Sequence, residues 1–136
     1  MTQNEAKLDL ELLEEMAGLG IEDLRELIDA YLEQATEGMQ KICSAIDAKN
    51  ADEVADLAHR LAGSSAVCGM TSAMNMLRML EQSGCKANWP AIEMQEVQAI
   101  REIESNERLV RDYLGEKNQK LRGVFVPPAI AQMSHS

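Results

Sequence analysis

The side chain best suited to chemistry in this sequence is the imidazole of His59. A neutral imidazole is a nucleophile and a proton acceptor near neutral pH. If the segment is helical, His59 lies about 140° around the helix from Val54, at 100° per residue. The segment's core positions lie within about 60° of Val54, and they are Leu57, Ala58, Leu61 and Ser65. The geometry therefore predicts that His59 points away from the core, whereas no role is predicted for the other histidine, His135.

The neighbours of His59 on the same helix face are all small. At i−4, i+3, i+4 and i+7 they are Ala55, Ala62, Gly63 and Ala66. An exposed helix face normally carries Lys, Glu, Gln or Arg, and glycine inside a helix costs about 0.5–1 kcal/mol relative to alanine. Either these residues pack against a neighbouring helix, or they leave room for something large to approach the imidazole. We favour the second interpretation and predict a docking surface.

Spacing argues against several kinds of catalytic site. Ser64 and Ser65 project about 140° and 120° away from His59, so neither can share a proton with it. Asp56 and His59 form an i, i+3 pair, but di-metal helix bundles need that motif twice, and it occurs once. No glycine-rich loop follows a strand to hold a nucleotide. We expect no metal and no cofactor on this chain, and an exposed nucleophile whose partner supplies the rest of the active site.

The elements that must position His59 are predicted to be helices. Apolar residues recur every three or four positions through roughly 21–48, 51–67, 71–84 and 88–117, after a shorter stretch over 8–16. No useful length of chain alternates with period two. The expected fold is all-α, an antiparallel up-down four-helix bundle with a short additional N-terminal helix. It forms a single domain over 1–117, and 118–136 is predicted to be a mobile tail.

Capping residues set the expected helix boundaries. Asn50 is expected to cap the helix that carries His59, and Gly69 is expected to end it. Thr71 or Ser72 is expected to cap the following helix, which should end at Gly84.

The composition limits the partners of the chain. It carries 13 Lys+Arg and 23 Asp+Glu, a net charge of −10, and the excess lies in residues 1–60 with 15 acidic and 5 basic side chains. A chain this acidic does not suit nucleic acid, because phosphate contacts need clustered Lys and Arg. No apolar run approaches the ~18 residues of a membrane span, and the N-terminus lacks a signal-peptide pattern. Three cysteines at unrelated spacings indicate reduced thiols. We expect a cytoplasmic monomer.

The segment Ala58-His59-Arg60-Leu61-Ala62-Gly63-Ser64-Ser65, with Gly69 ten residues after the histidine, resembles the phosphoacceptor segment of histidine-containing phosphotransfer (HPt) domains. The resemblance covers roughly 8–117. It implies a carrier without kinase activity of its own, in which His59 takes a phosphoryl group from the aspartyl phosphate of a response-regulator receiver domain and passes it to another receiver. The implied partners are receiver domains, which supply the acidic pocket and Mg²⁺, and a hybrid sensor histidine kinase.

One position departs from the family pattern. Ala62 stands where the family commonly has a lysine beside the phosphoryl group. Arg60, Arg78 and Lys86 are the candidate replacements, with Ser65 as a further candidate to stabilise the phosphate, although Arg60 is turned about 100° from His59. The departure keeps open an alternative, an HPt-fold module that docks receivers without carrying phosphate. An enzyme that uses His59 as a base is disfavoured, because no partner side chain is within reach.

Overall fold

The computed structural model describes residues 7–122, and every secondary-structure element in that range is a helix. The prediction of an all-helical chain is confirmed for these residues. Most of the predicted tail, including His135, lies outside the described residues. The helices are α2 (Leu10–Leu19), α3 (Ile21–Asp47), α4 (Ala51–Val67), α5 (Thr71–Cys85) and α6 (Trp89–Arg122).

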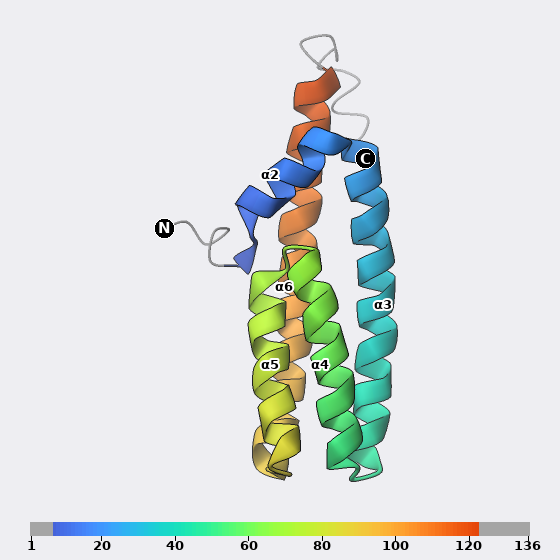
Figure 1. Cartoon of the computed structure of the whole chain (residues 1–136), viewed down its shortest axis with the longest axis vertical. Helices are drawn as coiled ribbons and strands as arrows, with labels where there is room; N and C mark the ends of the chain where they lie inside the picture. The colour runs from blue at the N-terminus through green and yellow to red at the C-terminus, as the bar shows by residue number, and fades with distance from the viewer. Residues whose placement is uncertain (1–6, 123–136) are drawn as a thin grey trace.

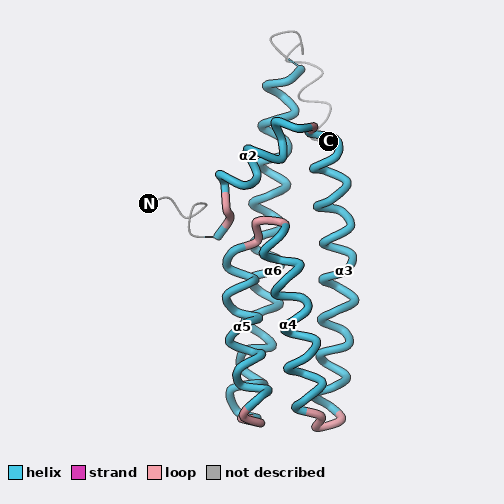
Figure 2. The backbone as a smooth tube through the Cα atoms, in the orientation of Figure 1, coloured by secondary structure: helices cyan, strands magenta, loops and turns pink. Residues whose placement is uncertain are grey.

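Four of the helices run side by side along the long axis of the molecule (Figure 1). Helix α3 packs against α4, α4 against α5, α5 against α6, and α6 against α3. Helix α2 packs against α3 above the ends of α4 and α5, and short turns join α3, α4, α5 and α6 (Figure 2). This arrangement is compatible with the predicted four-helix bundle and added N-terminal helix. Over residues 7–122, no helix combines the length and the apolarity that crossing a membrane requires.

Burial follows the apolar stripes read from the sequence. Removing these side chains from water is the main term that holds the helices together, at about 25 cal/mol per Å². Because α4 turns its large apolar side chains inward, the opposite face of α4 must look outward. The largest fully buried side chains on the four long helices include Leu24, Ile28, Ile42, Val54, Leu77, Leu80, Ile92, Val110 and Leu114.

Both ends of the helix that carries His59 are fixed as predicted. The Asn50 side chain accepts a hydrogen bond from the Glu53 backbone N–H at 3.1 Å, which caps the start of α4. At the other end Gly69 adopts φ +74°, and the Met70 N–H donates to the Ser65 carbonyl at 2.8 Å. This left-handed turn at glycine is typical of helix C-termini.

The predicted cap of α5 is wrong. Helix α5 begins at Thr71, and no side chain at its N-cap, Met70, bonds to the helix. Asn106 of α6 does this work instead: its Oδ1 accepts from the Ala73 N–H at 3.1 Å, and its Nδ2 donates to the Ser72 hydroxyl at 2.8 Å. The buried amide of Asn106 therefore joins the start of α5 to α6.

Three predicted helix ends also differ from the structure. Gly84 does not end α5, which continues to Cys85, because the Schellman-like turn falls later, where the Asn88 N–H donates to the Ser83 carbonyl at 3.0 Å. Helix α6 continues to Arg122, beyond the predicted 117, and α2 reaches Leu19 rather than Met16. Periodicity alone locates such ends poorly, because polar residues extend a helix without adding to its apolar stripe.

Candidate functional site

His59 projects from α4 into solvent, as its position on the helix predicts. Its side chain is 71% exposed, whereas Ala58 and Leu61 beside it are buried. A ring in this position is open to a second molecule the size of a protein domain.

The imidazole is held by one carboxylate from the neighbouring helix. Its Nδ1 lies 3.0 Å from Oε2 of Glu81 on α5. An ionised carboxylate can only accept a hydrogen bond, so the proton of the ring is placed on Nδ1. In the neutral ring, the lone pair then resides on Nε2. The contact fixes the orientation of the ring and leaves Nε2 as its nucleophilic nitrogen.

The ring and its partner line a shallow hollow between α4 and α5, which we call the His59 hollow. It measures about 450 Å³ and is open to solvent. Within residues 7–122, no group of three or more His, Cys, Asp or Glu side chains is arranged to hold a metal ion. The His59 hollow is therefore an acidic surface around a single imidazole. Its lining residues are Asp52, Ala55, Asp56, His59, Glu81 and Cys85.

Two of the four small neighbours are buried, which corrects the interpretation favoured from sequence. A Cβ added at Gly84 of α5 would lie 2.9 Å from the Ala55 backbone nitrogen, so the two helix backbones are in contact there. Ala55 and Ala62 are 9% and 3% exposed, respectively. The close approach of α4 and α5 explains the alanine at position 55, and both alanines are buried, so they offer little surface to a partner.

Gly63 behaves differently from the two alanines. It is exposed, and a Cβ added there would meet no atom of another element within 4 Å. Packing within the described residues therefore gives no reason for glycine at this position. Ala66, one turn further along α4, is half-buried. The predicted docking surface is reduced to Gly63 and the exposed part of Ala66.

Three basic side chains were candidates to stand in for a lysine at position 62. Arg60 donates to the carboxylate of Asp56, one turn back on α4, so its charge is already paired. Arg78 and Lys86 are both exposed and, within the described residues, form no ion pair or hydrogen bond.

The register of α4 and α5 separates Arg78 from Lys86. The helices are antiparallel, with Gly84 against Ala55 and Glu81 against His59. One turn earlier on α5, Arg78 stands opposite the turn of α4 that holds Ala62, about 60° around the helix from Glu81. Lys86 lies about 140° from Glu81, on another side of α5. Arg78 is therefore the better placed of the two cations.

Ser65 was also a candidate to stabilise the phosphate, and the structure contradicts that assignment. Its side chain is fully buried, and its hydroxyl donates to the Leu61 carbonyl at 2.9 Å. The Tyr31 hydroxyl lies 2.7 Å from the Ser65 oxygen and donates to it. Burial raises the pKa of Tyr31 to about 12, so this donor stays protonated. Ser65 ties α4 to α3 inside the bundle and does not face the ring of His59.

The buried position of Ser65 predicts that Ser65→Ala affects stability rather than the transfer expected at His59. The substitution leaves the buried Tyr31 hydroxyl without its acceptor, which should lower the free energy of unfolding by about 1–3 kcal/mol. Urea denaturation followed by circular dichroism measures the loss. The rate of phosphoryl transfer at a temperature where the variant is folded should match that of the unchanged chain, and a large drop in that rate would restore Ser65 to the site.

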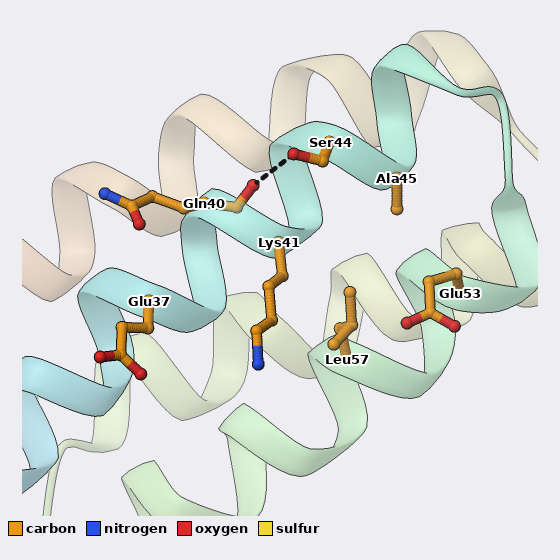
Figure 3. A pocket seen from close by; sticks show the side chains of 7 residues that line it. All are labelled: Glu37, Gln40, Lys41, Ser44, Ala45, Glu53 and Leu57. Carbon is orange, nitrogen blue, oxygen red and sulfur yellow. Dashed lines mark hydrogen bonds between the residues drawn. The ribbon is translucent and has the colours of Figure 1, made fainter.

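A second hollow, of about 490 Å³, lies between α3 and α4 (Figure 3). Lys41 projects from α3 toward α4 within it, and the Ser44 hydroxyl donates to the Gln40 carbonyl at 3.2 Å. Its α4 side consists of Glu53 and Leu57, which lie on the other side of that helix from His59. None of the predicted site residues lines it.

Comparison with known families fits this geometry. The model of the Hpt domain matches residues 26–115, more than half of the chain. The chain belongs to the Hpt domain family. Proteins of this family are phosphorelay carriers rather than kinases, and their partners belong to two-component systems. The resemblance inferred from the segment around His59 is thereby confirmed.

A known crystal structure has a fold similar to that of this Hpt domain. The crystal structure of histidine-containing phosphotransfer protein B (HptB) from Pseudomonas aeruginosa PAO1 matches with a TM-score of 0.75 and 19% sequence identity. The match covers 81% of this chain and 96% of that one. At this identity the likeness concerns the fold. No curated protein matches the sequence.

The residue of this Hpt domain that sequence reasoning missed is Glu81. The candidates expected from outside the helix of His59 were two bases, Arg78 and Lys86, whereas the side chain that contacts the ring is a carboxylate 22 residues further along the chain. A signal was present: Glu81 lies about 70° from the mean direction of Leu77, Leu80 and Gly84, at the edge of the apolar stripe of α5. A carboxylate at such an edge reaches the side chains of the adjacent helix, but only the register of the two helices says which ones.

Proposed function

We propose that this Hpt domain accepts a phosphoryl group on Nε2 of His59 from the aspartyl phosphate of a receiver domain. It then passes the group to an aspartate of a second receiver. The observation that carries the proposal is the 71% exposed imidazole whose Nδ1 is held by Glu81. That arrangement presents one nucleophilic nitrogen to a partner and no other catalytic group.

The transfer balances without a proton leaving the ring. The Nε2 lone pair forms a bond to phosphorus while the bond from phosphorus to the aspartyl oxygen breaks, and the aspartate leaves as a carboxylate. The ring, still protonated on Nδ1, becomes a cation. The Glu81 carboxylate at 3.0 Å stabilises that charge as it develops. The reverse sequence delivers the group to the next aspartate.

The partner receiver supplies what this chain lacks. We propose that Mg²⁺ is bound by the acidic pocket of the receiver, that no cofactor is bound by this chain, and that a hybrid sensor histidine kinase charges the relay in the cytoplasm. In such a reaction catalysis rests on positioning and charge neutralisation within the complex. Gly63, exposed one turn from His59, leaves room for the receiver to approach.

The proposal is tested with a phosphorylated receiver domain, Mg²⁺ and the full chain. Acid-labile, alkali-stable phosphate should appear on this chain as it disappears from the receiver. If receivers bind at the His59 face and none delivers phosphate, the chain is instead a docking module of the same fold. If no receiver from the source organism binds or delivers phosphate, both functions are lost.

Glu81 is expected to set the rate of transfer through the ring. Replacing it with leucine removes a charge-assisted hydrogen bond, worth about 1.5–3 kcal/mol. We expect transfer at least about tenfold slower, since each 1.36 kcal/mol is tenfold in rate. Glu81→Gln keeps an acceptor oxygen, so its transfer rate should lie between those of the unchanged chain and Glu81→Leu. Equal rates for all three chains in a rapid-quench assay would contradict the role given to Glu81.

Arg78 is proposed to neutralise the phosphoryl group in place of a lysine at position 62. A phosphoryl group brings about two negative charges next to Asp52, Asp56 and Glu81. Arg78→Gln should therefore shorten the half-life of the phosphorylated chain or slow its formation, by about two- to tenfold. Lys86→Gln is the matched control, because it removes the same charge from another side of α5. Equal effects of the two substitutions would exclude a specific role for Arg78.

A further inference from the structure

A groove of about 380 Å³ runs between α3 and α6, two neighbouring helices that take no part in the His59 hollow. Polar contacts join the two helices near each end of it. The Cys43 thiol donates to Glu96 at 3.3 Å at one end, and Arg111 pairs with Asp29 beyond the other. No ion pair between described residues crosses the stretch between these contacts.

The floor of the groove is apolar. Ile100 and Ile103 of α6 are half-buried and supply most of its accessible apolar surface, whereas Leu32, Ala35 and Met39 of α3 are 8%, 0% and 7% exposed and form its packed base. Met39 adds a flexible side chain that adapts to different shapes. One turn before Ile100, Val97 is 47% exposed and continues the apolar surface along α6. An apolar strip of this kind between two helices suits the apolar face of a third helix.

The rim of the groove is acidic. Glu104 and Glu107 line its α6 side, and Glu33 stands on the α3 side, one turn before Thr36. All three are exposed, and within the described residues none is paired with a base. A ligand that covers the floor therefore meets negative charge on both sides.

We propose that this groove binds a basic amphipathic helix of another protein, with apolar residues on the floor and Lys or Arg against the rim. Charge complementarity favours this occupant over two others. A second copy of this chain, with its net charge of −10, would place one acidic rim near another. The chain's own segment 123–134 carries no charged residue, so it matches the floor but not the rim.

The proposal is independent of phosphoryl transfer. The groove belongs to α3 and α6 and the ring to α4, with its partner on α5, so a helix bound in the groove leaves His59 open. A bound partner would hold the carrier near a receiver or kinase. His59→Gln should leave binding in the groove unchanged, which separates a failure of this inference from a failure of the proposed function.

The test uses a designed helical peptide of about 18 residues, with leucine on one face and lysine on the other. Added to the isotope-labelled full chain, it should shift amide resonances of residues 32–43 and 97–107. Glu104→Lys with Glu107→Lys should weaken binding about tenfold, and a peptide with glutamate in place of lysine should not bind. The matched control is Asp112→Lys with Glu116→Lys, the same charge change on another side of α6.

Four outcomes would overturn the proposal. The first is peptide shifts that map to the His59 hollow, and the second is equal weakening by the rim and control pairs, which would indicate unspecific attraction. The third is a dimer of this chain in analytical ultracentrifugation whose stability changes when Glu104 and Glu107 are both replaced by lysine, which would make a second copy the occupant. The fourth is a set of nuclear Overhauser contacts between the ring of Phe125 and the methyl groups of Ile103, which would assign the groove to the chain's own segment.

Discussion

Replacing His59 with glutamine should abolish acceptance of a phosphoryl group while leaving the fold intact. The amide has no nucleophilic nitrogen, so labelled phosphate on the chain should fall below detection when a labelled receiver is the donor. A side chain that is 71% exposed contributes little to packing, and the free energy of unfolding should change by no more than about 0.5 kcal/mol. Gel autoradiography and thermal melting measure the two effects separately.

A matched control keeps this result specific to the imidazole. Val67 is 65% exposed on the same helix, and Val67→Gln should leave transfer close to that of the unchanged chain. Phosphate that appears equally on the His59→Gln chain would move the acceptor to another residue. Loss of transfer in both substituted chains would show that the assay reports damage to α4 rather than loss of the nucleophile.

The second large effect is expected at Gly84, where the contact between α4 and α5 is closest. A Cβ there would lie 2.9 Å from the Ala55 nitrogen and 3.1 Å from the Ala51 carbonyl oxygen, and backbone atoms cannot move aside singly. Gly84→Ala should therefore separate the helices at an overpacking cost of about 1–3 kcal/mol. The preference of alanine for helix offsets about 0.5–1 kcal/mol of that. Glu81 is one turn away, so transfer should slow as well.

Gly63→Ala, on α4, is expected to raise stability, the opposite of the effect expected for Gly84→Ala on α5. A Cβ at Gly63 meets open space, so only the helix preference remains, and stability should rise by about 0.5–1 kcal/mol. Urea midpoints at unchanged slope compare the two variants. If Gly84→Ala also raises the midpoint, the two helix backbones are not in close contact at Ala55.

The features that could be predicted from the sequence are those that depend on one helix at a time. The apolar stripes of 21–48 and 51–67 match α3 and α4 because a helix with one buried face repeats every 3.6 residues. The same arithmetic predicted that His59 points outward. The Asn50 cap and the turn at Gly69 are equally local, since their partners lie within five residues.

Features that depend on the register between helices could not be predicted. The residues at positions 55, 62 and 63 are all small, yet Ala55 and Ala62 are buried and Gly63 is exposed to solvent. Glu81 contacts His59, and Asn106 caps α5, across separations of 22 and 33 residues. A single sequence contains no signal for how far one helix slides along another, so the orienting carboxylate emerges only from the folded bundle.

The exposure of a single imidazole on one face of α4 has a consequence for the order in which partners can bind. Under the proposed function, donor and acceptor receivers would both have to reach the same Nε2, so they would compete for one binding site and could not occupy it together. Transfer from one receiver to the other would then need two successive binding events, and the donor would have to dissociate before the acceptor could bind. An abundant acceptor receiver would bind the unphosphorylated chain and so slow its phosphorylation by the donor. The throughput would be greatest when both receivers bind weakly and leave quickly.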